Sequence, residues 1–431
     1  MDQLVKDDFA QATPNLLTVP TRRAGSRDLS PLPAELYLEI FEHLKPPENP
    51  EAPRETHDLR SLAQVCRYFC AVMMPRIFEV VFIDGGADEN HSGTSFCQSI
   101  CNGDQTALTA ASHVKIFRIT STSVDLGWSY KEFLSLYAKA ILRMRNLVEI
   151  SLVQTSITNG LLKAIVSLPG LKKLVLQGCN PRKLRQQLLD QLSHLQLETL
   201  YVENLDMDEE DDEEHSAPAR AFFTRLPLQN VVILKALCPY VSEQILALPP
   251  LLNLQDFHAL SLRVGVNFPD ILSKMPNLKR LEIHSLDFPS SDTIFRGHLP
   301  TLHHLQEVCA PMVVLEKVIP GSSISSIEVS YRVHCGSNYD KLSEPRDAEV
   351  KLLSKSRRPI TSLKVPFSFY TATQFSVAFP ALRSLAIRPS HFNYEDGNHA
   401  YWLQESVEEV RVPVPTSTLV LTLSLMCTLS L

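Results

Sequence analysis

Cysteine and histidine side chains could bind a metal ion or supply a nucleophile, and in this 431-residue chain they gather in two places. The first contains Cys97 and Cys101, with His91 and His113 nearby. A structural zinc site needs a second closely spaced pair of ligands, and the two histidines are too far apart to form one. A nucleophilic cysteine needs a base beside it, and no motif here orders such a pair. We expect free or buried thiols and no metal ion.

The second cluster, which comprises His298, His303 and His304 with Cys309, also lacks two matched ligand pairs. The chain contains none of the patterns G-x-G, G-x-x-x-x-G-K-[ST], G-x-S-x-G and H-E-x-x-H. These patterns mark dinucleotide sites, P-loops, hydrolase nucleophiles and zinc proteases. We therefore predict no catalytic residues, no metal and no cofactor, and keep an enzyme built on the repeats described below as an alternative.

The net charge of −7 argues against a nucleic-acid partner. Eight acidic residues lie in one run from Asp206 to Glu214, and without them the net charge changes from −7 to +1. Like charges this dense repel one another, so residues 206–215 are expected to form a solvated loop insertion. A basic partner for this run is the alternative.

Nine cysteines, an odd number scattered through a long chain, do not form a disulfide framework. Reduced thiols indicate a cytoplasmic or nuclear protein. Residues 1–28 are polar, lack the apolar core of a secretion signal, and are expected to be a disordered leader. No segment is long and apolar enough to span a bilayer, so no membrane partner is predicted.

Short strands that recur along the chain would hold outward-facing side chains in place. The pattern apolar-x-x-apolar-x-apolar begins at residues 114, 147, 171, 197, 228, 254, 278, 305, 324, 360, 382 and 407. The mean spacing is about 27 residues, within the 20–29 range of leucine-rich repeats. The hit at 228 uses Leu228, Val231 and Ile233, and the last one uses Val407, Val410 and Val412.

Finer features of the repeats are more specific than their number. The strict form L-x-x-L-x-L-x-x-C-N occurs at Leu171–Asn180, and Pro169, Pro276 and Pro380 each precede a strand by two residues. Suitable short helices, Leu161–Leu168 and Phe268–Met275, come before two of these prolines. Residues from about 110 to 415 thus resemble irregular leucine-rich repeats. Each strand–helix unit is too small to bury its own apolar face, so neighbouring units should stack into a solenoid.

The side chains between the inward-facing positions would form a binding surface. They carry both charge signs and few aromatic rings, which favours a protein partner without identifying it. Any single one is more often an ordinary solvated residue than an important contact. The candidate target-binding residues are Lys173, Tyr201, Arg280, Glu282, His284 and Arg388.

Residues 29–80 contain two apolar helical stripes followed by a short strand at 80–83. The first stripe follows Pro33, a residue favoured in the first turn of a helix, and consists of Leu36, Ile40, Phe41 and Leu44. Four prolines predict a loop over residues 45–57. The second helix is expected to begin after the N-cap Asp58 and to end at Pro75. Its stripe consists of Leu59, Leu62, Val65, Cys66, Phe69 and Val72.

Two short helices cannot shield both stripes from water, so some of this surface should meet a partner or the following domain.

The text L-P-x-E-L-x-x-x-I-F-x-x-L, a spacer, and then D-L-x-x-L-x-x-V-C-R-x-F resembles an F-box, of the type found in fungal proteins. It covers about 50 residues, and its proline-rich spacer is longer than is usual in the family. The resemblance implies a module that docks on the Skp adaptor of a cullin–RING ubiquitin ligase. The adaptor-binding residues that it implies are Leu32, Pro33, Leu36, Ile40, Phe41, Leu44, Leu59, Leu62, Val65, Cys66 and Phe69.

Residues 416–431 alternate leucine with threonine and serine, which indicates a final capping strand, with a membrane tail as the alternative. The sequence thus predicts an α/β protein with a leader (1–28), a helical F-box unit (29–80), a repeat solenoid (81–415) and a terminal strand or tail (416–431). We expect a substrate-recognition subunit of a Skp–cullin–F-box ligase that binds an unknown target protein for ubiquitination and degradation. The alternative is a binding scaffold outside any ligase, with the helices as a cap.

Overall fold

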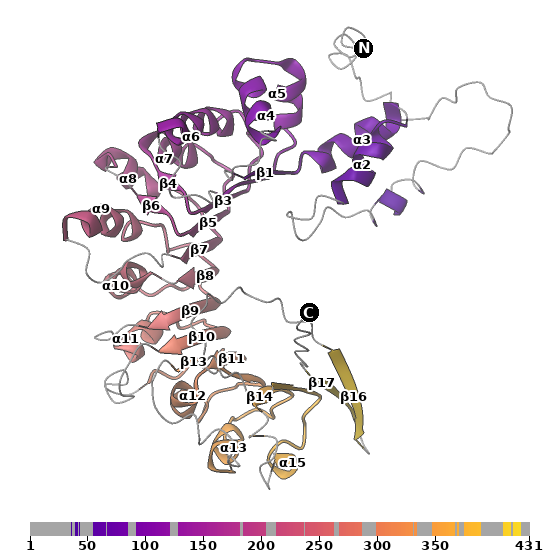
Figure 1. Ribbon diagram of the computed structural model, residues 1–431. Helices are drawn as coiled ribbons and strands as arrows, with labels where there is room; N and C mark the ends of the chain where they lie inside the picture. The colour runs from indigo at the N-terminus through magenta and orange to yellow at the C-terminus, as the bar shows by residue number, and fades with distance from the viewer. Residues whose placement is uncertain are drawn as a thin grey trace, which may run out of the picture. The chain divides into compact units, whose positions relative to one another are not determined.

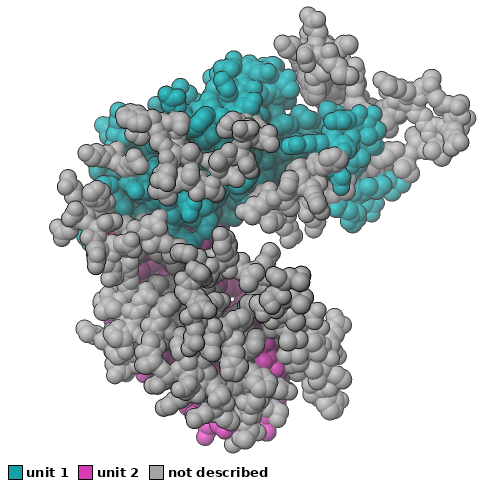
Figure 2. Space-filling model, viewed as in Figure 1, with its two compact units in different colours: residues 1–197, 203–227 teal, residues 198–202, 228–431 magenta. Residues whose placement is uncertain are grey.

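The computed structural model of the chain describes residues 36, 39–41, 43, 55–65, 67–84, 92–120, 128–181, 184–203, 213–236, 238–262, 267–286, 299–330, 332–333, 347–366, 369, 375–388, 408–414 and 417–423. The predicted leader at 1–28 lies outside these residues. The chain divides into two compact units (Figure 2), which are treated separately below. Unit 1 contains residues 1–197 and 203–227, and unit 2 contains residues 198–202 and 228–431.

Unit 1 begins with a small helical region. Residues 36 and 39–41 are helical, and they are followed by α2 (Glu55–Ala63) and α3 (Arg67–Ile77). Phe41, Leu59 and Met73 form a core cluster of their own. The ring of Phe69 packs edge-on against Phe41, with 5.1 Å between the ring centroids. Arg76 Nη1 donates a hydrogen bond to the carbonyl oxygen of Phe41, which ties the first helical segment to α3.

The rest of unit 1 alternates strands with helices. Its elements are β1 (Val80–Asp84), α4 (Ser92–Cys101), α5 (Gln105–Ala111), β2 (Ile116–Thr120), α6 (Trp128–Ile141), β3 (Glu149–Val153), β4 (Ser156–Ile157), α7 (Asn159–Val166), β5 (Lys173–Gln177), β6 (Asn180–Pro181), α8 (Gln186–Leu192) and α9 (Glu213–Phe223). The strands β1, β2, β3 and β5 pair in parallel and in chain order. Helix α4 contacts α6, α6 contacts α7, and α7 contacts α8.

Unit 2 continues the same alternation with more strands. Its elements are β7 (Thr199–Glu203), β8 (Ile233–Ala236), α10 (Pro239–Ala247), β9 (Asp256–Leu262), α11 (Phe268–Ser273), β10 (Arg280–Leu286), β11 (Glu307–Ala310), α12 (Met312–Val318), β12 (Ser326–Val329), β13 (Arg332–Val333), α13 (Asp347–Leu353), β14 (Ser362–Pro366), α15 (Phe375–Ala378), β15 (Ser384–Arg388), β16 (Glu408–Val414) and β17 (Ser417–Leu423). From β7 to β15 the main strands pair in parallel and in chain order, while the short β13 pairs with β10. Helices α6, α7 and α8 of unit 1 lie along one side of its strands, and so do α10 and α11 in unit 2 (Figure 1). The predicted α/β fold with parallel strands is confirmed.

A repeated hydrogen-bond pattern fixes the entry of each strand. In unit 2, the carbonyl of Gln255 accepts from the backbone N–H groups of Lys279 and Arg280, at 2.7 and 3.0 Å. The carbonyl of Lys279 then accepts in the same way from the next strand. Unit 1 shows the same arrangement, in which the carbonyl of Glu79 accepts from residues 115 and 116. Successive strands therefore enter each sheet in one register, which is the local consequence of the sequence repeat.

The strict repeat at Leu171–Asn180 shows how one repeat packs against its neighbour. Leu171, Leu174 and Leu176 point inward and are almost fully buried. Cys179 is also buried, and its Sγ lies 3.2 Å from the carbonyl oxygen of Leu152 in the preceding repeat. Gly178 has φ = 56°, a backbone conformation that glycine adopts without strain. The cysteine of the repeat therefore joins neighbouring repeats and is not exposed for chemistry.

Some predicted boundaries in the helical region are wrong. The single helix expected from Asp58 to Pro75 is two helices, with a turn at residues 64–65 after the end of the first, and α2 already begins at Glu55. Pro75 lies inside α3, which continues to Ile77. Pro75 lacks the N–H that would bond to the carbonyl of residue 71, and the packing of Phe69 and Met73 in the core offsets this loss. The break turns α3 so that Phe69 and Met73 reach the cluster around Phe41.

Three other boundaries differ from the prediction. In the repeat assigned to Leu228, Val231 and Ile233, the inward strand residues are Leu234 and Ala236, because β8 begins three residues later than the pattern suggested. Residues 408–414 do not continue the parallel array, since β16 pairs antiparallel with β17, and β17 lies next to β15. Finally, the acidic run is not all loop, because α9 begins at Glu213. Acidic residues are favoured in the first turn of a helix, where they face its positive end.

Candidate functional site

The helical region of unit 1 exposes apolar side chains although it has a core of its own. Leu36, Ile40 and Val65 are 42%, 51% and 65% exposed, whereas Phe41 and Leu59 are both 2% exposed. Ile40 and Phe41 are consecutive, so the helix that buries one presents the other to solvent. We call Leu36, Ile40 and Val65 the apolar helical surface. Isolated exposed apolar residues need no explanation, but this small unit has three of them beside a core of its own.

This division separates the predicted adaptor-binding residues into groups. Leu36, Ile40 and Val65 are available for contact, while Phe41 and Leu59 hold the helices together. Leu62 and Phe69 are partly buried against that core. The remaining four, Leu32, Pro33, Leu44 and Cys66, lie outside the described residues.

A second surface is formed by the outward side chains of the unit 2 strands. The parallel register places residues of neighbouring strands side by side in two rows. Row A contains Asp256, Arg280, Glu307, Ser326, Ser362 and Ser384. Row B contains Tyr201, Lys235, His258, Glu282, Cys309, Glu328 and Lys364. Inward residues such as Leu281 and Val308 lie between the rows in sequence and are buried.

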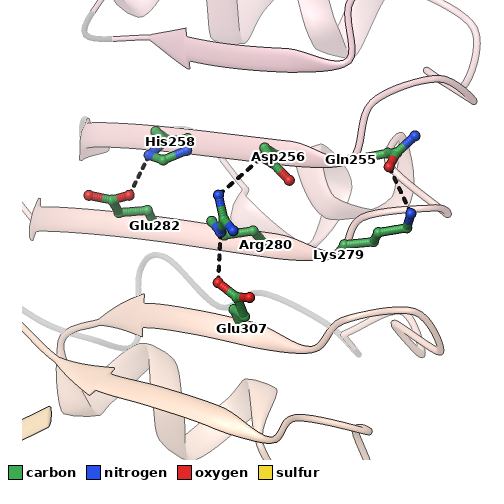
Figure 3. A network of polar contacts seen from close by, with 7 residues as sticks. All are labelled: Gln255, Asp256, His258, Lys279, Arg280, Glu282 and Glu307. Atoms are coloured by element: carbon green, nitrogen blue, oxygen red, sulfur yellow. Dashed lines mark hydrogen bonds and ion pairs between the residues drawn. The ribbon is translucent and has the colours of Figure 1, made fainter. Parts of the chain in front are cut away.

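Ion pairs run across the strands in both rows. In row A, Arg280 Nη1 lies 3.2 Å from Asp256 Oδ2, and its Nε lies 2.8 Å from Glu307 Oε2 (Figure 3). In row B, His258 Nδ1 contacts Glu282 Oε2 (Figure 3). The surface is therefore organised by contacts between opposite charges, each of which links adjacent strands.

Further contacts extend this pattern to both sides. Lys364 Nζ lies 3.3 Å from Glu328 Oε1. At the other end of row B, the Lys235 ammonium lies 6.0 Å from the centre of the Tyr201 ring, within reach of a cation–π contact. Lys279 donates a hydrogen bond of 2.8 Å to the Gln255 side chain, at the entry of the strands (Figure 3).

The strand face contains a small depression of about 260 Å³. It is lined by His258, Arg280, Glu282, Glu307, Val308, Cys309, Ser326 and Glu328. Cys309 and Ser326 have the shortest outward side chains of this set, so the longer side chains on neighbouring strands rise around them. Three carboxylates and one guanidinium give the lining a formal charge of −2 when His258 is neutral.

The charges of the lining act on Arg280. The hydrogen bond to Glu307 raises the pKa of Arg280, and the carboxylates of Asp256 and Glu282 add to this effect, while burial opposes it. The guanidinium therefore stays charged, because the neighbouring carboxylates favour its protonated form.

The structure brings together only some of the predicted target-binding residues. Arg280 and Glu282 are adjacent on β10, and Tyr201 lies in row B of the same unit. Lys173 belongs to unit 1, where its Nζ lies 3.1 Å from the carboxylate of Glu149. For His284 in β10 and Arg388 in β15 the structure describes the backbone alone.

Sequence reasoning missed several members of this surface. Asp256, His258 and Glu307 were not selected, although each lies beside Arg280 or Glu282 in the sheet. Aligning the repeats and reading outward positions across them, instead of along one strand, would have found these residues.

The cysteine and histidine clusters do not form metal sites in the described part of the chain. No group of three potential ligands there could hold a metal ion. Cys97 is buried, and its surroundings raise its pKa to about 12, chiefly because burial disfavours the thiolate. Burial also raises the pKa of Cys179 to about 12. Neither thiol is suited to act as a nucleophile near neutral pH, because the thiolate is the reactive form. His91 and His298 lie outside the described residues.

Among the described helices, none has the length and apolar character needed to cross a bilayer. A scan against protein-family models finds no match for this chain, and a search of curated proteins finds no similar sequence.

Proposed function

We propose that the chain is a substrate-recognition subunit of a cullin–RING ubiquitin ligase. In this proposal the helical region is an F-box that docks on a Skp-type adaptor. The strand–helix stack is an irregular leucine-rich-repeat solenoid that holds a target protein in the cytoplasm or nucleus. The chain itself has no catalytic role, and ubiquitin transfer is accelerated because the target is held close to a conjugating enzyme bound elsewhere in the ligase.

The observation that carries the proposal is the apolar helical surface. A unit of about 50 residues is marginally stable, and apolar side chains that stay exposed do not add the stabilisation that their burial would give. The helical region nevertheless has a closed core around Phe41, Leu59 and Met73 and keeps Leu36, Ile40 and Val65 exposed. Such a division is expected of a docking module, and the exposed residues belong to the F-box-like pattern of the sequence.

The strand face of unit 2 supports the second half of the proposal. Its charged side chains lie on strands whose inward residues are buried, and they form ion pairs with one another. Recognition of a protein by a rigid polar surface requires this kind of order.

The adaptor contact can be tested with the full chain. The double variant Leu36→Asp/Ile40→Asp should reduce binding to a purified Skp-type adaptor by at least about 100-fold, since two apolar contacts are replaced by buried charges. Biolayer interferometry would measure the affinity, and circular dichroism would show whether the helices are retained. Phe41 is left intact because its substitution would disrupt the core.

A matched control is Leu252→Asp. Leu252 is 61% exposed in unit 2, so this change places a carboxylate on a leucine that is more exposed than Leu36 and lies away from the helical region. It should leave adaptor binding unchanged. If the folded double variant binds the adaptor as well as the wild type does, or the wild type does not bind it at all, the ligase proposal is wrong and the scaffold alternative is favoured.

A further inference from the structure

The depression on the unit 2 strand face has properties that specify a ligand class. It is smaller than the roughly 300–1,000 Å³ of most small-molecule sites, which argues against a cofactor or metabolite. It is also unsuited to a metal ion, because no group of potential ligands in the described residues has the required geometry. Its dimensions and position between strands suit one side chain of another protein.

The charge of the lining selects the type of side chain. Glu282, Glu307 and Glu328 come from three successive strands, which lie about 4.8 Å apart. They line the depression together with the shorter side chains of Cys309 and Ser326 and the guanidinium of Arg280. A bound acidic side chain would be repelled, whereas a basic one would meet oppositely charged groups on several sides.

Each of the three carboxylates already has a partner on the strand face. Glu307 contacts Arg280 through Oε2, Glu282 contacts His258, and Glu328 Oε1 lies 3.3 Å from Lys364 Nζ. A basic ligand would share these carboxylates with their present partners, and the side chain of Glu307 is about half exposed. Arg280 is held by Asp256 on the opposite side, which keeps its guanidinium from closing over the depression. The strand face is therefore ordered before a ligand arrives, and little side-chain entropy is lost on binding.

We propose that this depression binds an arginine or lysine side chain of a protein target, with Glu282, Glu307 and Glu328 surrounding the basic group and Cys309 and Ser326 forming the floor. The inference rests on the proposed function, since it supplies the chemistry by which the ligase subunit would select its target. Arginine is the better fit, because its planar guanidinium can bind two carboxylates at once.

The test uses the full-length chain and synthetic fluorescein-labelled dodecapeptides of glycine and serine that carry three evenly spaced arginines. Matched peptides carry three lysines, three citrullines or three glutamates. Fluorescence anisotropy should show binding of the arginine and lysine peptides, and at least about tenfold weaker binding of the uncharged citrulline peptide. Equal binding of the arginine and citrulline peptides would overturn the proposal.

Two variants then locate the site. Glu282→Gln/Glu328→Gln removes two charges, and Cys309→Met fills the floor without altering any charge. Both should weaken arginine-peptide binding at least about tenfold, since the site needs its charge and its volume. The matched control Glu316→Gln removes a charge from the exposed side of α12 and should have no effect. If both variants bind like the wild type, the peptide binds elsewhere, for example at the acidic run, and the proposal is wrong.

The outcome is separable from that of the adaptor experiment. Both variants should retain adaptor binding, and Leu36→Asp/Ile40→Asp should retain peptide binding. Loss of adaptor binding in all proteins with intact peptide binding would refute the ligase role alone. Intact adaptor binding without selective peptide binding would refute the basic-side-chain site alone.

Discussion

The helical region and the unit 2 strand face present opposite kinds of binding surface. The helical region exposes apolar side chains over a core of three fully buried residues, Phe41, Leu59 and Met73. The strand face exposes charged side chains over a continuous array of buried leucine, isoleucine and valine. An apolar surface gives affinity that salt hardly changes, whereas ordered charges give selectivity that depends on salt. The apolar surface therefore suits a partner that is always the same, and the charged surface suits a partner that is selected by its charge.

The largest expected difference between the two regions concerns stability. Phe41→Ala removes a buried aromatic ring and should destabilise the helical region by about 3–5 kcal/mol, which is enough to unfold so small a unit. Limited proteolysis should then cut within residues 55–77 and leave unit 2 intact. The exposed neighbour provides the control, since Ile40→Ala should leave the cleavage pattern unchanged. Equal protease resistance of Phe41→Ala and the wild type would show that the helical region does not depend on this core.

Cysteine reactivity provides the next contrast. Cys179 in the unit 1 stack is buried, and its pKa is raised to about 12, so at pH 9 its thiolate fraction is lower by about 500-fold than that of a free cysteine. Half-buried Cys70 in α3 should react with iodoacetamide well before Cys179. Mass spectrometry after timed labelling would measure both rates. Comparable rates would mean that the stack opens as readily as the helical region.

The raised cysteine pKa values also predict the direction of a pH effect. Between about pH 9 and about pH 12 the unfolded chain releases protons from Cys97 and Cys179 that the folded chain retains. The stability that these thiols contribute is therefore complete below about pH 9 and is lost as the pH rises toward 12. Urea denaturation of wild type and Cys97→Ala between pH 8 and pH 10.5 would test this. The variant should lose less stability than the wild type over this range, and an equal loss would contradict the prediction.

Salt should affect the two surfaces differently. Because the Debye length falls from about 10 Å at 0.1 M salt to about 3 Å at 1 M, arginine-peptide binding should weaken about tenfold over this range, while adaptor binding should change less than about twofold. Anisotropy and interferometry titrations on one protein preparation would compare them. A similar salt dependence of both affinities would remove the proposed distinction between the surfaces.

The smallest effect is expected for Arg280→Ala. Its ion pairs are partly exposed, so the free energy of unfolding should change by less than about 1 kcal/mol. The variant makes the depression more negative, and it should therefore bind the arginine peptide several-fold more tightly. Urea denaturation and anisotropy measure the two quantities. Weaker peptide binding would indicate that Arg280 itself contacts the ligand.

The sequence predicted most of the strands because the apolar residues that each strand buries recur at a fixed local spacing. Leu171, Leu174 and Leu176 are inward in the structure as their spacing implies, and the same holds for Leu278, Leu281 and Ile283. The period fails where several apolar residues lie close together, as between Leu228 and Leu234, because more than one register then places apolar residues inward. It also failed at Pro75, where tertiary contacts of Met73 outweigh the helix-breaking tendency of proline.

The sequence predicted the candidate surfaces less completely than it predicted the fold. The apolar stripe of the helices could be recognised, but which members face solvent depends on how three helical segments pack around Phe41. The depression depends on residues that are spread along the sequence from His258 to Glu328 and that only the strand register brings together. Spacing along one strand identifies Arg280 and Glu282 but not the carboxylates beside them.

The antiparallel strand β16 has a consequence for the self-association of the protein. A stack of parallel strands that ended in another parallel strand would offer its edge to a second copy of the chain, and such addition could continue indefinitely. Among the described strands, β17 is paired on both sides, and β16, which runs in the opposite direction and contains Pro413, has a partner on one side. Proline lacks the backbone N–H that an added strand would need. The hairpin of β16 and β17 therefore disfavours the addition of another strand, and deleting residues 408–423 should increase self-association, which analytical ultracentrifugation would measure.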